Sequence, residues 1–326
     1  TADISRYLKR GNVVIYESTV YPGCTKEECV PLLEKSGLKW KKDFFVGFSP
    51  ERMNPGDKQH TIKNIYKVVG GDTPETTEFM RWLYSKVTDG KVVIAPSIEV
   101  AEASKMLENL QRDINIALIN EYTIIMNKMG ISIYDVLECA KTKWNFIPFT
   151  PGLVGGHCIA VDPYYIIHKA EAMGYHTKVI YGARLINDSF HTHIASLIIQ
   201  CLLKKNGNFH DNTILILGFT FKENVSDIRN TRIAHLYHEL LTYKLKIKIC
   251  DPYASPSEVK KEYGIEIVQE LPSKEKFDAI VLAVPHSPFI NLNEEDILKL
   301  SHKNTIIFDI KGVWRGKIKK LPYFTL

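Results

Sequence analysis

One stretch of the sequence combines the residue types that covalent catalysis needs. Residues 151–158 read PGLVGGHC, and Asp162 and Pro163 follow shortly after. Glycines let a backbone approach a ligand closely or adopt positive φ angles, and Pro163 suits the first position of a helix that Asp162 would cap. Cys158 is then expected on a tight loop beside His157 and a helix N-terminus, surroundings that favour a reactive thiolate. The pattern leaves two interpretations open: a nucleophilic cysteine, or a glycine turn with an inert thiol.

A second pair of polar residues lies on a predicted helix. Lys105 and Asn109 are four residues apart, so they share one helix face. A cation beside an amide donor is suited to stabilising an oxyanion, although the spacing alone favours an exposed lysine and a surface asparagine. The histidines, including His191 and His193, lack the company of other metal ligands, and we predict no metal site.

Short apolar runs alternate with helical segments at both ends of the chain, which indicates an α/β fold with mainly parallel sheets. The predicted strands are 13–16, 44–48, 66–69, 91–94, 213–219, 246–250, 265–268, 278–284 and 305–310. The middle of the chain has helical periodicity and begins with one long helix over 97–126. We therefore predict an N-terminal α/β domain (1–96), a central helical connector that carries the cysteine loop (97–204) and a C-terminal α/β domain (205–326).

Composition narrows the class of protein. The 326 residues are 45% hydrophobic and 24% charged, which is typical of a folded globular chain. The net charge is +5, and the lysines are scattered rather than gathered into a stripe that would bind nucleic acid. No apolar run approaches the roughly 18 residues that span a bilayer, so membrane insertion is not expected. Six cysteines without a CxxC pair favour a reducing compartment, the cytoplasm.

Several motifs, in the same order along the chain, resemble the UDP-glucose/GDP-mannose dehydrogenase family. They are residues 17–23 (ESTVYPG), 48–52 (FSPER), 102–109 (EASKMLEN), 155–158 (GGHC) followed by Asp162, and 218–229 (GFTFKENVSDIR). The Gly-Gly-x-Cys…Asp spacing is the most specific of these. Residues 54–58 (NPGDK) and 142–146 (TKWNF) are most similar to the bacterial branch that acts on UDP-N-acetylhexosamines. Glucose-specific members tend to carry a second acid four residues after Glu51, where this chain has Pro55.

The resemblance implies two Rossmann-like parallel-sheet domains joined by the long central helix. It also implies an NAD-dependent enzyme that oxidises a primary alcohol of a UDP-sugar to a carboxylate, for surface polysaccharides such as capsule or O-antigen. Members of this family transfer two hydrides to two NAD⁺, and a cysteine captures the aldehyde as a thiohemiacetal, which becomes a thioester and is hydrolysed. In this chain the resemblance assigns that nucleophile to Cys158.

The other catalytic residues are assigned by the same resemblance. Lys105 and Asn109 would stabilise the oxyanion at the reacting carbon. Asp162 would position or activate the hydrolytic water, with Thr19 assisting proton transfer, and Glu51 would place a carboxylate near the reacting centre. Thr19 and Glu51 are also expected, together with the nucleophile, to contact NAD.

Substrate contacts are expected from two lysines and several loop residues. Lys222 resembles the family lysine that reaches the ligand from the C-terminal domain, and Lys311 stands where the family often has an arginine near the diphosphate. Either cation suits a pyrophosphate, but lysine lacks the bidentate fork of arginine. Further contacts are assigned to Asn145, Phe146, Gly155, Gly156 and Arg184. For Arg184, a dimer contact and a surface salt bridge are the alternatives.

One expected motif is not found in the sequence. The family begins with a strand, a GxGxxG turn and a helix, which seat the NAD pyrophosphate. No such motif precedes Thr19. We therefore expect the N-terminal domain to be truncated, with its glycine-rich first half missing, so that the chain alone could be inactive.

Three alternative functions and an oligomeric state complete the expectations. A UDP-glucose 6-dehydrogenase and a non-catalytic module that binds sugar nucleotides both fit parts of the sequence, the second because the NAD fingerprint is absent. A hydroxyacid or 6-phosphogluconate-type dehydrogenase is disfavoured, since it needs neither the cysteine loop nor a second α/β domain. The apolar face of the predicted helix over 97–126, together with the family resemblance, favours a homodimer.

Overall fold

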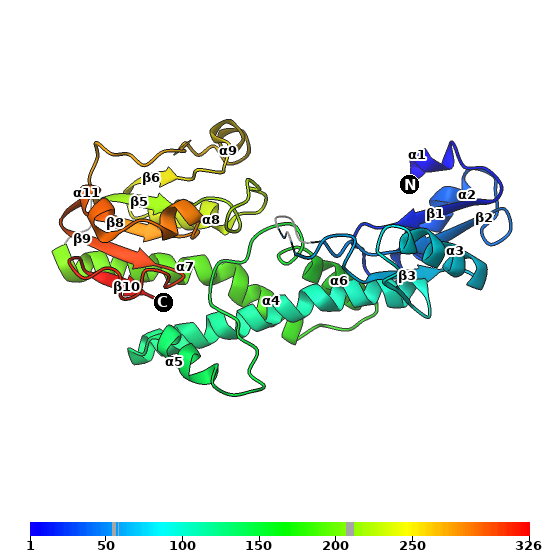
Figure 1. Cartoon of the computed structure of the whole chain (residues 1–326), viewed down its shortest axis with the longest axis horizontal. Coiled ribbons are helices and arrows are strands. Elements are labelled where there is room, and N and C mark those ends of the chain that lie inside the picture. Colours follow the sequence, from blue (N-terminus) through cyan, green and yellow to red (C-terminus); the bar gives the residue numbers. More distant parts are fainter. Residues whose placement is uncertain (54–56, 58, 207–211) are drawn as a thin grey trace. The chain divides into compact units, whose positions relative to one another are not determined.

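The computed structural model describes residues 1–53, 57, 59–206 and 212–326. Residue contacts divide them into two compact units (Figure 1). Unit 1 comprises Thr1–Gln111 and Val161–Thr177, and unit 2 comprises Arg112–Ala160 and Lys178–Leu326. The three-part division into domains stays a prediction. Residues 54–56 and 58 of the hexosamine-like motif, Pro55 among them, and residues 207–211 lie outside the described residues.

Unit 1 is built on a four-stranded sheet in the order β1-β2-β3-β4. The strands are β1 (Asn12–Tyr16), β2 (Phe44–Phe48), β3 (Lys67–Gly71) and β4 (Val92–Ile94). β1 pairs with β2 and β3 with β4 in parallel, as predicted, whereas β2 and β3 are antiparallel. A parallel crossover usually needs a helix, and the described residues between β2 and β3 form none.

The helices of unit 1 pack around this sheet. They are α1 (Ala2–Ser5), the π-helical turn η1 (Thr25–Cys29) continuing into α2 (Val30–Glu34), α3 (Pro74–Ser85), α6 (Asp162–Ala172) and the first part of α4 (Ile98–Met129). The long helix expected over 97–126 is confirmed as α4, which has 32 residues. The expected cap of α6 is wrong: Val161 occupies the N-cap position, and Asp162 is the first helical residue.

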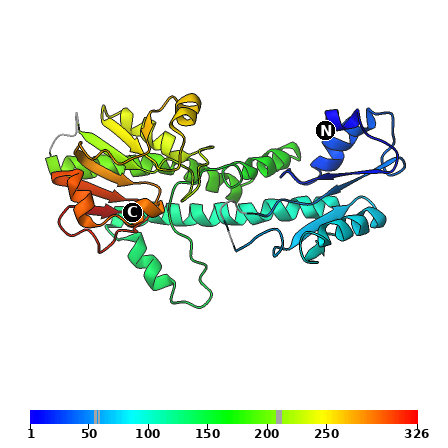
Figure 2. The same ribbon diagram turned by 45° about the horizontal axis from the view of Figure 1, so that its top comes forward.

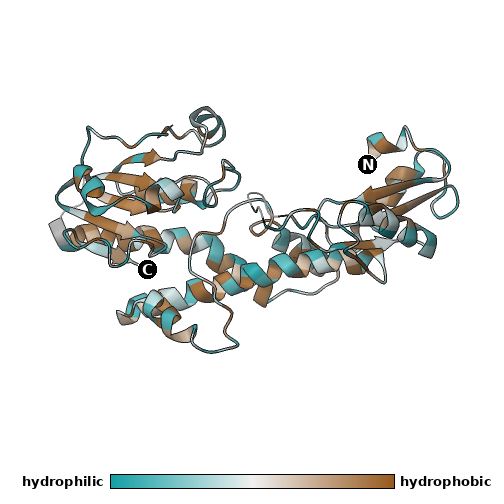
Figure 3. Ribbon diagram, viewed as in Figure 1, coloured by the Kyte–Doolittle hydropathy of each residue, from teal (hydrophilic) through white to brown (hydrophobic). Residues whose placement is uncertain are grey.

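Unit 2 contains a six-stranded sheet in which every observed pairing is parallel. Its order is β10-β9-β8-β5-β6-β7. The strands are β5 (Thr213–Leu217), β6 (Lys246–Cys250), β7 (Ile267–Val268), β8 (Phe277–Leu282), β9 (Ser301–Asp309) and β10 (Tyr323–Thr325). β5 and β8 are almost wholly apolar and buried (Figure 3), as expected for parallel strands that are covered on both faces. The chain order reverses at β5, which creates a topological switch point beyond its carboxyl end.

Helices cover the unit 2 sheet on both faces, where two hydrophobic clusters lie. They are the second part of α4, α5 (Ile133–Ala140), α7 (Val179–Asn206), α8 (Arg232–Leu241), α9 (Pro256–Tyr263), α10 (Ser287–Ile290) and α11 (Glu294–Lys299). α7 packs against α8 and β9 (Figure 2). The sequence pattern predicts a helix over 228–241, but α8 begins four residues later, because Thr231 caps it through the N–H of Ile233. The α/β class with Rossmann-like parallel sheets is confirmed.

Within the part of the chain that the structure describes, no helix is both long and apolar enough to traverse a lipid bilayer.

Candidate active site

In unit 1, three of the predicted catalytic residues lie on α4 and at the start of α6. Lys105 and Asn109 are one turn apart on α4, and each is nine-tenths buried. The Asn109 amide donates a hydrogen bond of 2.5 Å to the buried carboxylate of Asp162. The spacing of Lys105 and Asn109 in the sequence suggested that they form a pair. The tertiary structure shows in addition that Asp162 contacts Asn109.

Thr19 and Glu51 follow the carboxyl ends of neighbouring parallel strands. β1 ends at Tyr16 and β2 at Phe48, and these two residues are paired in register. The ladder continues past the strands, because Ser49 N–H donates to the carbonyl of Tyr16 and Glu51 N–H to that of Glu17. The carboxyl edge of parallel strands is the usual ligand edge of an α/β sheet.

The loop that carries Glu51 is held by two cations. The ammonium of Lys67, itself buried, donates to the carbonyl of Pro50 at 3.1 Å and pairs with Glu17 at 3.0 Å. Arg52 forms an ion pair of 2.8 Å with Glu108 on α4. Glu108 precedes Asn109 directly, so this contact ties the Glu51 loop to the helix that carries two of the catalytic candidates.

In unit 2, Cys158 lies exposed on a loop whose glycines are required by packing. A Cβ atom at Gly155 would lie 2.8 Å from the carbonyl oxygen of Asn230, and one at Gly156 would lie 2.9 Å from the Phe221 ring. Gly156 also has a φ of +84°, which side chains rarely allow. The cysteine loop therefore packs directly against the segment that follows β5.

An arginine–aspartate pair accompanies the cysteine. Arg229 binds Asp227 through two guanidinium nitrogens, and this hydrogen bond, with a smaller contribution from Cys158, raises the pKa of Arg229. The hydrogen bond from Arg229 lowers the pKa of Asp227, and His157 adds to that effect. A guanidinium near a thiol favours the thiolate, which is the nucleophilic form.

Three other cysteines are poor nucleophiles. Burial raises the pKa of Cys24 to about 12, that of Cys201 to about 11 and that of Cys250 to about 12. Because the thiolate is the reactive form, these thiols are almost fully protonated at neutral pH. Cys139 is exposed, like Cys158, but it lies at the C-terminal end of α5 without a glycine loop around it.

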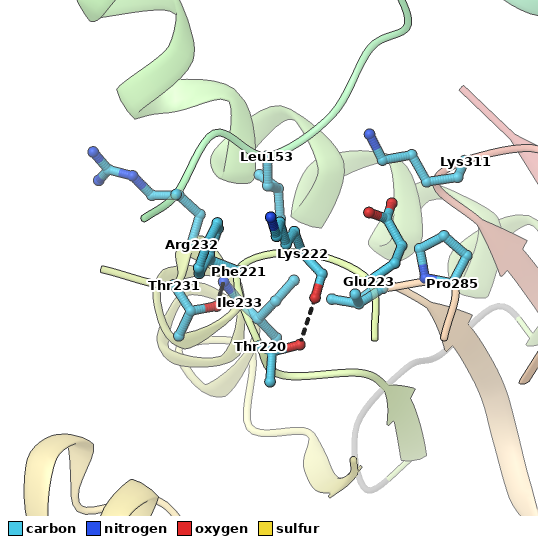
Figure 4. A pocket seen from close by; sticks show the side chains of 13 residues that line it. Leu153, Thr220, Phe221, Lys222, Glu223, Thr231, Arg232, Ile233, Pro285 and Lys311 are labelled. Carbon is cyan, nitrogen blue, oxygen red and sulfur yellow. Dashed lines mark hydrogen bonds between the residues drawn. The ribbon is translucent and has the colours of Figure 1, made fainter. Parts of the chain in front are cut away.

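A pocket of about 140 Å³ opens in unit 2 beside the cysteine loop. It lies beyond the carboxyl ends of β5 and β8, and three basic residues from separate segments are among those that line it (Figure 4). They are Lys222, Arg232 and Lys311, opposed by the single acid Glu223 among the lining residues. The first residues of α8 also line the pocket, and the N-terminus of a helix favours an anion. The pocket is therefore suited to a ligand with several negative charges.

Lys311 connects the pocket to the cysteine loop. Its ammonium donates to the carbonyl of Pro151 at 3.1 Å, and a Cβ at Gly152 would lie 2.3 Å from the same nitrogen. Burial lowers the pKa of Lys311, and the Glu223 carboxylate partly offsets this effect. An anionic ligand would stabilise the charged form of Lys311 in these surroundings.

The remaining predicted substrate residues have mixed placements. Gly155 lines the pocket, whereas Gly156, Asn145 and Phe146 are not among its described lining residues. Phe146 packs against the larger hydrophobic cluster of unit 2, and Asn145 is exposed. Arg184 is 1% exposed and pairs with buried Asp113 at 2.6 Å, so the alternative of a surface salt bridge is wrong. The ligand and dimer roles of Arg184 stay predictions.

Sequence reasoning assigned only Gly155, Lys222 and Lys311 of the lining residues to the substrate; the pocket residues that it missed include Glu223, Thr231 and Arg232. Arg232 also binds the carboxylate of Asp188 and the carbonyl of Val154 in the cysteine loop. The start of α8, with a threonine cap followed by an arginine, is the signal that would have found two of them. It was overlooked because the helix was predicted to begin at residue 228.

Comparisons with known proteins agree with this arrangement. Three domains of the UDP-glucose/GDP-mannose dehydrogenase family match the chain in order: the NAD binding domain at 1–88, the central domain at 99–189 and the UDP binding domain at 215–316. A UDP-N-acetyl-D-glucosamine 6-dehydrogenase of Pseudomonas aeruginosa is 49% identical over 94% of this chain and 73% of its own length. The chain belongs to the UDP-glucose/GDP-mannose dehydrogenase family.

Two further relatives support the same family assignment. Protein CapL of Staphylococcus aureus is 49% identical over 95% of the chain and 73% of its own length. A solved UDP-D-ManNAc dehydrogenase from Pyrococcus horikoshii superposes with a TM-score of 0.86 at 29% identity, over 99% of this chain and 74% of that one. The protein is an NAD-dependent dehydrogenase of nucleotide sugars.

The residues of unit 1 fit NAD at one end. Thr19 and Glu51 stand at the carboxyl edge of β1 and β2, where a dinucleotide is bound in such sheets. The helical segment after β1 does not offer its N–H groups to a pyrophosphate, because the Glu102 carboxylate accepts those of Gly23 and Thr25 at 2.6 and 3.0 Å. Thr19 and Glu51 stay predicted contacts to NAD. When bound, NAD⁺ supplies a hydride acceptor.

Proposed function

We propose that this dehydrogenase oxidises the C6 hydroxymethyl group of a UDP-N-acetylhexosamine to the uronate. The observation that carries the proposal is the polycationic pocket of unit 2, joined through Lys311 to the loop of an exposed cysteine. Two relatives at 47–49% identity are named UDP-N-acetyl-D-glucosamine 6-dehydrogenases. The name CapL of a third supports a role in surface polysaccharide synthesis.

In this proposal Cys158 forms the covalent intermediates. The first oxidation removes a hydride from C6 and the hydroxyl proton, which leaves an aldehyde. The thiolate adds to the aldehyde carbon to form a thiohemiacetal, and loss of a second hydride from that carbon yields a thioester. Water then breaks the C–S bond, which releases the carboxylate and restores the thiol. The neighbouring Arg229 supports the nucleophile by favouring its thiolate form.

In the proposal, residues of α4 and α6 stabilise negative charge and assist proton transfer. Lys105 and the Asn109 amide would stabilise the negative oxygen on the tetrahedral carbon. Asp162, held by Asn109, would orient the hydrolytic water, and Thr19 would assist proton transfer. Glu51 accepts the N–H of Met53, which fixes its carboxylate at the edge of the sheet.

The UDP group is assigned to unit 2. Lys222, Lys311 and Arg232 would bind the diphosphate, with the N-terminus of α8 adding its dipole. Gly155 permits close approach of the cysteine loop to the segment after β5. Asn145, Phe146, Gly156 and Arg184 stay predictions as further substrate contacts.

The proposal is tested with a panel of UDP-GlcNAc, UDP-GalNAc, UDP-ManNAc and UDP-glucose. We expect one of the N-acetylated sugars to give the highest kcat/KM and two NADH per product. Preference for UDP-glucose would contradict the assigned substrate class. Calorimetric titration with NAD⁺ and UDP-sugar separately distinguishes the enzyme from a binding module, which would bind the sugar nucleotide alone.

A matched pair of cysteine variants tests the nucleophile. Cys158→Ser is expected to lower uronate formation by roughly 10⁴-fold while UDP-sugar binding stays near wild type, because an alcohol is a far weaker nucleophile than a thiolate. Cys139→Ser replaces the other exposed thiol and is expected to retain activity. Comparable activity of the two variants would overturn the assignment of Cys158.

We also propose a homodimer and a cytoplasmic location. An apolar stripe on the unit 2 part of α4 remains exposed, formed by Leu118, Tyr122, Ile125 and Met129 at intervals of four, three and four residues. A Leu118→Glu/Ile125→Glu variant is expected to shift the mass measured by light scattering from dimer to monomer, whereas a monomeric wild type would contradict the proposal. Six free thiols support a reducing compartment.

A further inference from the structure

Behind the pocket of unit 2 lies a buried histidine–aspartate pair that the sequence did not single out. Asp251 directly follows β6, and His286 directly precedes α10. Both side chains are fully buried, and Nε2 of His286 lies 2.9 Å from Oδ2 of Asp251. His286 is also adjacent to Pro285, which lines the pocket.

Asp251 is an acceptor only, which determines the tautomer of His286. Its carboxylate accepts the N–H groups of Phe219, Thr220, Tyr253 and Ala254. Burial raises the pKa of Asp251, but the His286 imidazole and these N–H groups outweigh it and bring the pKa to about 2. An ionised carboxylate needs a donor opposite it, so Nε2 of His286 carries a proton.

The other ring nitrogen of His286 contacts the loop that carries Lys222. Nδ1 lies 3.0 Å from the backbone nitrogen of Asn224, whose N–H it must accept. On the opposite side of the lysine, Nε2 also lies 3.2 Å from Oγ1 of Thr220. The Thr220 hydroxyl in turn donates to the carbonyl of Lys222 at 2.9 Å (Figure 4). His286 therefore contacts the loop two residues before Lys222 and two residues after it.

The side chain of Asn224 also binds the start of α10. Asn224 has a φ of +57°, a left-handed conformation that asparagine adopts more readily than most other residues with a side chain. Its side-chain oxygen accepts the N–H of Ser287, the residue after His286. The turn after Lys222 is thus bound to the start of α10 by two hydrogen bonds, one through the imidazole and one through the amide. Lys222 is presented to the pocket from a rigid backbone.

We propose that His286 is a positioning residue, which holds the loop of Lys222 in the conformation that binds the diphosphate of the sugar nucleotide. The proposal rests on the assignment of the unit 2 pocket to UDP. His286 acts through backbone hydrogen bonds to the loop and does not touch the ligand.

Two variants separate the two ring nitrogens of His286. In His286→Asn, the side-chain oxygen replaces Nδ1 and retains the acceptor for Asn224. In His286→Gln, the longer amide replaces Nε2 and retains the contact to Asp251 while Nδ1 is lost. We expect the Gln variant to bind UDP roughly tenfold more weakly in calorimetry, because the Asn224 N–H loses its partner. The Asn variant is expected to stay within about threefold of wild type.

Steady-state kinetics provide a second measurement. For His286→Gln we expect KM for the UDP-sugar to rise while kcat at saturation is unchanged, since the cysteine chemistry is not altered. A loss confined to kcat would overturn the positioning role. Thr220→Val is a nearly isosteric change that removes the hydroxyl between His286 and the Lys222 carbonyl. It is expected to weaken UDP binding in the same direction and remains informative if the histidine variants do not fold.

Lys222→Ala distinguishes failure of this inference from failure of the proposed function. If Lys222→Ala weakens UDP binding and neither His286→Gln nor Thr220→Val does, the positioning role is overturned and the pocket assignment stands. If Lys222→Ala binds UDP like wild type, the pocket assignment itself fails. Equal weakening in the Gln and Asn variants would indicate general damage to packing and would overturn the specific role of Nδ1.

Discussion

Each unit contains a buried carboxylate that holds the backbone after the first strand of its sheet. In unit 1, Glu102 accepts the N–H groups of Gly23 and Thr25, which follow β1. In unit 2, Asp251 accepts those of Phe219 and Thr220, which follow β5. Both carboxylates are fully buried, yet the pKa of Glu102 is raised and that of Asp251 is lowered to about 2.

The difference lies in the partners and not in the depth of burial. Burial is the largest influence on both groups and raises both pKa values. Asp251 receives four N–H groups and an imidazole, whereas Glu102 faces a second carboxylate, Glu99, which raises its pKa further. The anchoring carboxyl group is therefore strongly ionised in unit 2 and more easily protonated in unit 1.

The larger expected effect is for Asp251→Asn. The change removes an ionised acceptor that is shared by four backbone N–H groups and the Nε2–H of His286, which costs about 3 kcal/mol of unfolding free energy. The amide would also point a donor at those N–H groups. Urea denaturation at pH 7, followed by circular dichroism, measures this loss. A cost below about 1 kcal/mol would mean that the pair in unit 2 is no stronger an anchor than an ordinary hydrogen bond.

The pH dependence of this variant sharpens the comparison. A carboxyl group with a lowered pKa stabilises the fold above its unfolded pKa, near 4, and this stabilisation is lost as the pH falls towards about 2. The difference in unfolding free energy between wild type and Asp251→Asn should therefore shrink between pH 4 and pH 2. An unchanged difference over that range would contradict the ionised state of Asp251.

A smaller effect is expected for Glu102→Gln. One N–H group of the Gly23–Thr25 turn loses its acceptor, which costs about 1–2 kcal/mol, because only two backbone N–H groups share this carboxylate. Urea denaturation under the same conditions measures it. A cost equal to that of Asp251→Asn would remove the distinction between the two anchors.

The pH dependence of the Glu102 variant has the opposite sign. A carboxyl group with a raised pKa contributes most stability below its unfolded value, about 4.5, and the contribution declines as the pH rises through the folded pKa. The difference between wild type and Glu102→Gln should therefore be larger at pH 4 than at pH 7. A difference that grows with pH would contradict the raised pKa.

Sequence patterns predicted much of the fold because apolar periodicity is a local property. The strands β5 to β9 of the unit 2 sheet and the long helix α4 follow directly from it, whereas the short strand β10 was not predicted. Helix starts were predicted less accurately: Thr231 caps α8 through its side chain, and Val161 takes the N-cap position of α6 without a side-chain hydrogen bond. The antiparallel pairing of β2 with β3 was missed, since pairing direction depends on contacts between distant residues.

Some residues of the candidate site could likewise be identified from the sequence, and others could not. Cys158 and its glycines form a compact motif that is visible in the sequence. The structure explains the glycines at 155 and 156, because a Cβ atom at either position would clash with neighbouring atoms. Arg184 was placed on the surface as one alternative, yet it is buried against Asp113, 71 residues earlier. His286 was not singled out at all, because nothing local distinguishes it from other histidines.

The sequence by itself determined the α/β class, the family and the glycine-rich loop of Cys158, since each rests on periodicity or on a short motif with fixed spacing. Only the tertiary structure decided which cations line one pocket and which carboxylate anchors which turn. It also decided that His286 accepts a bond from the Lys222 loop. The physical reason is that hydrogen bonds and burial act between atoms brought close by folding. His286 and Asn224 are separated by 62 residues along the chain and by one hydrogen bond in space.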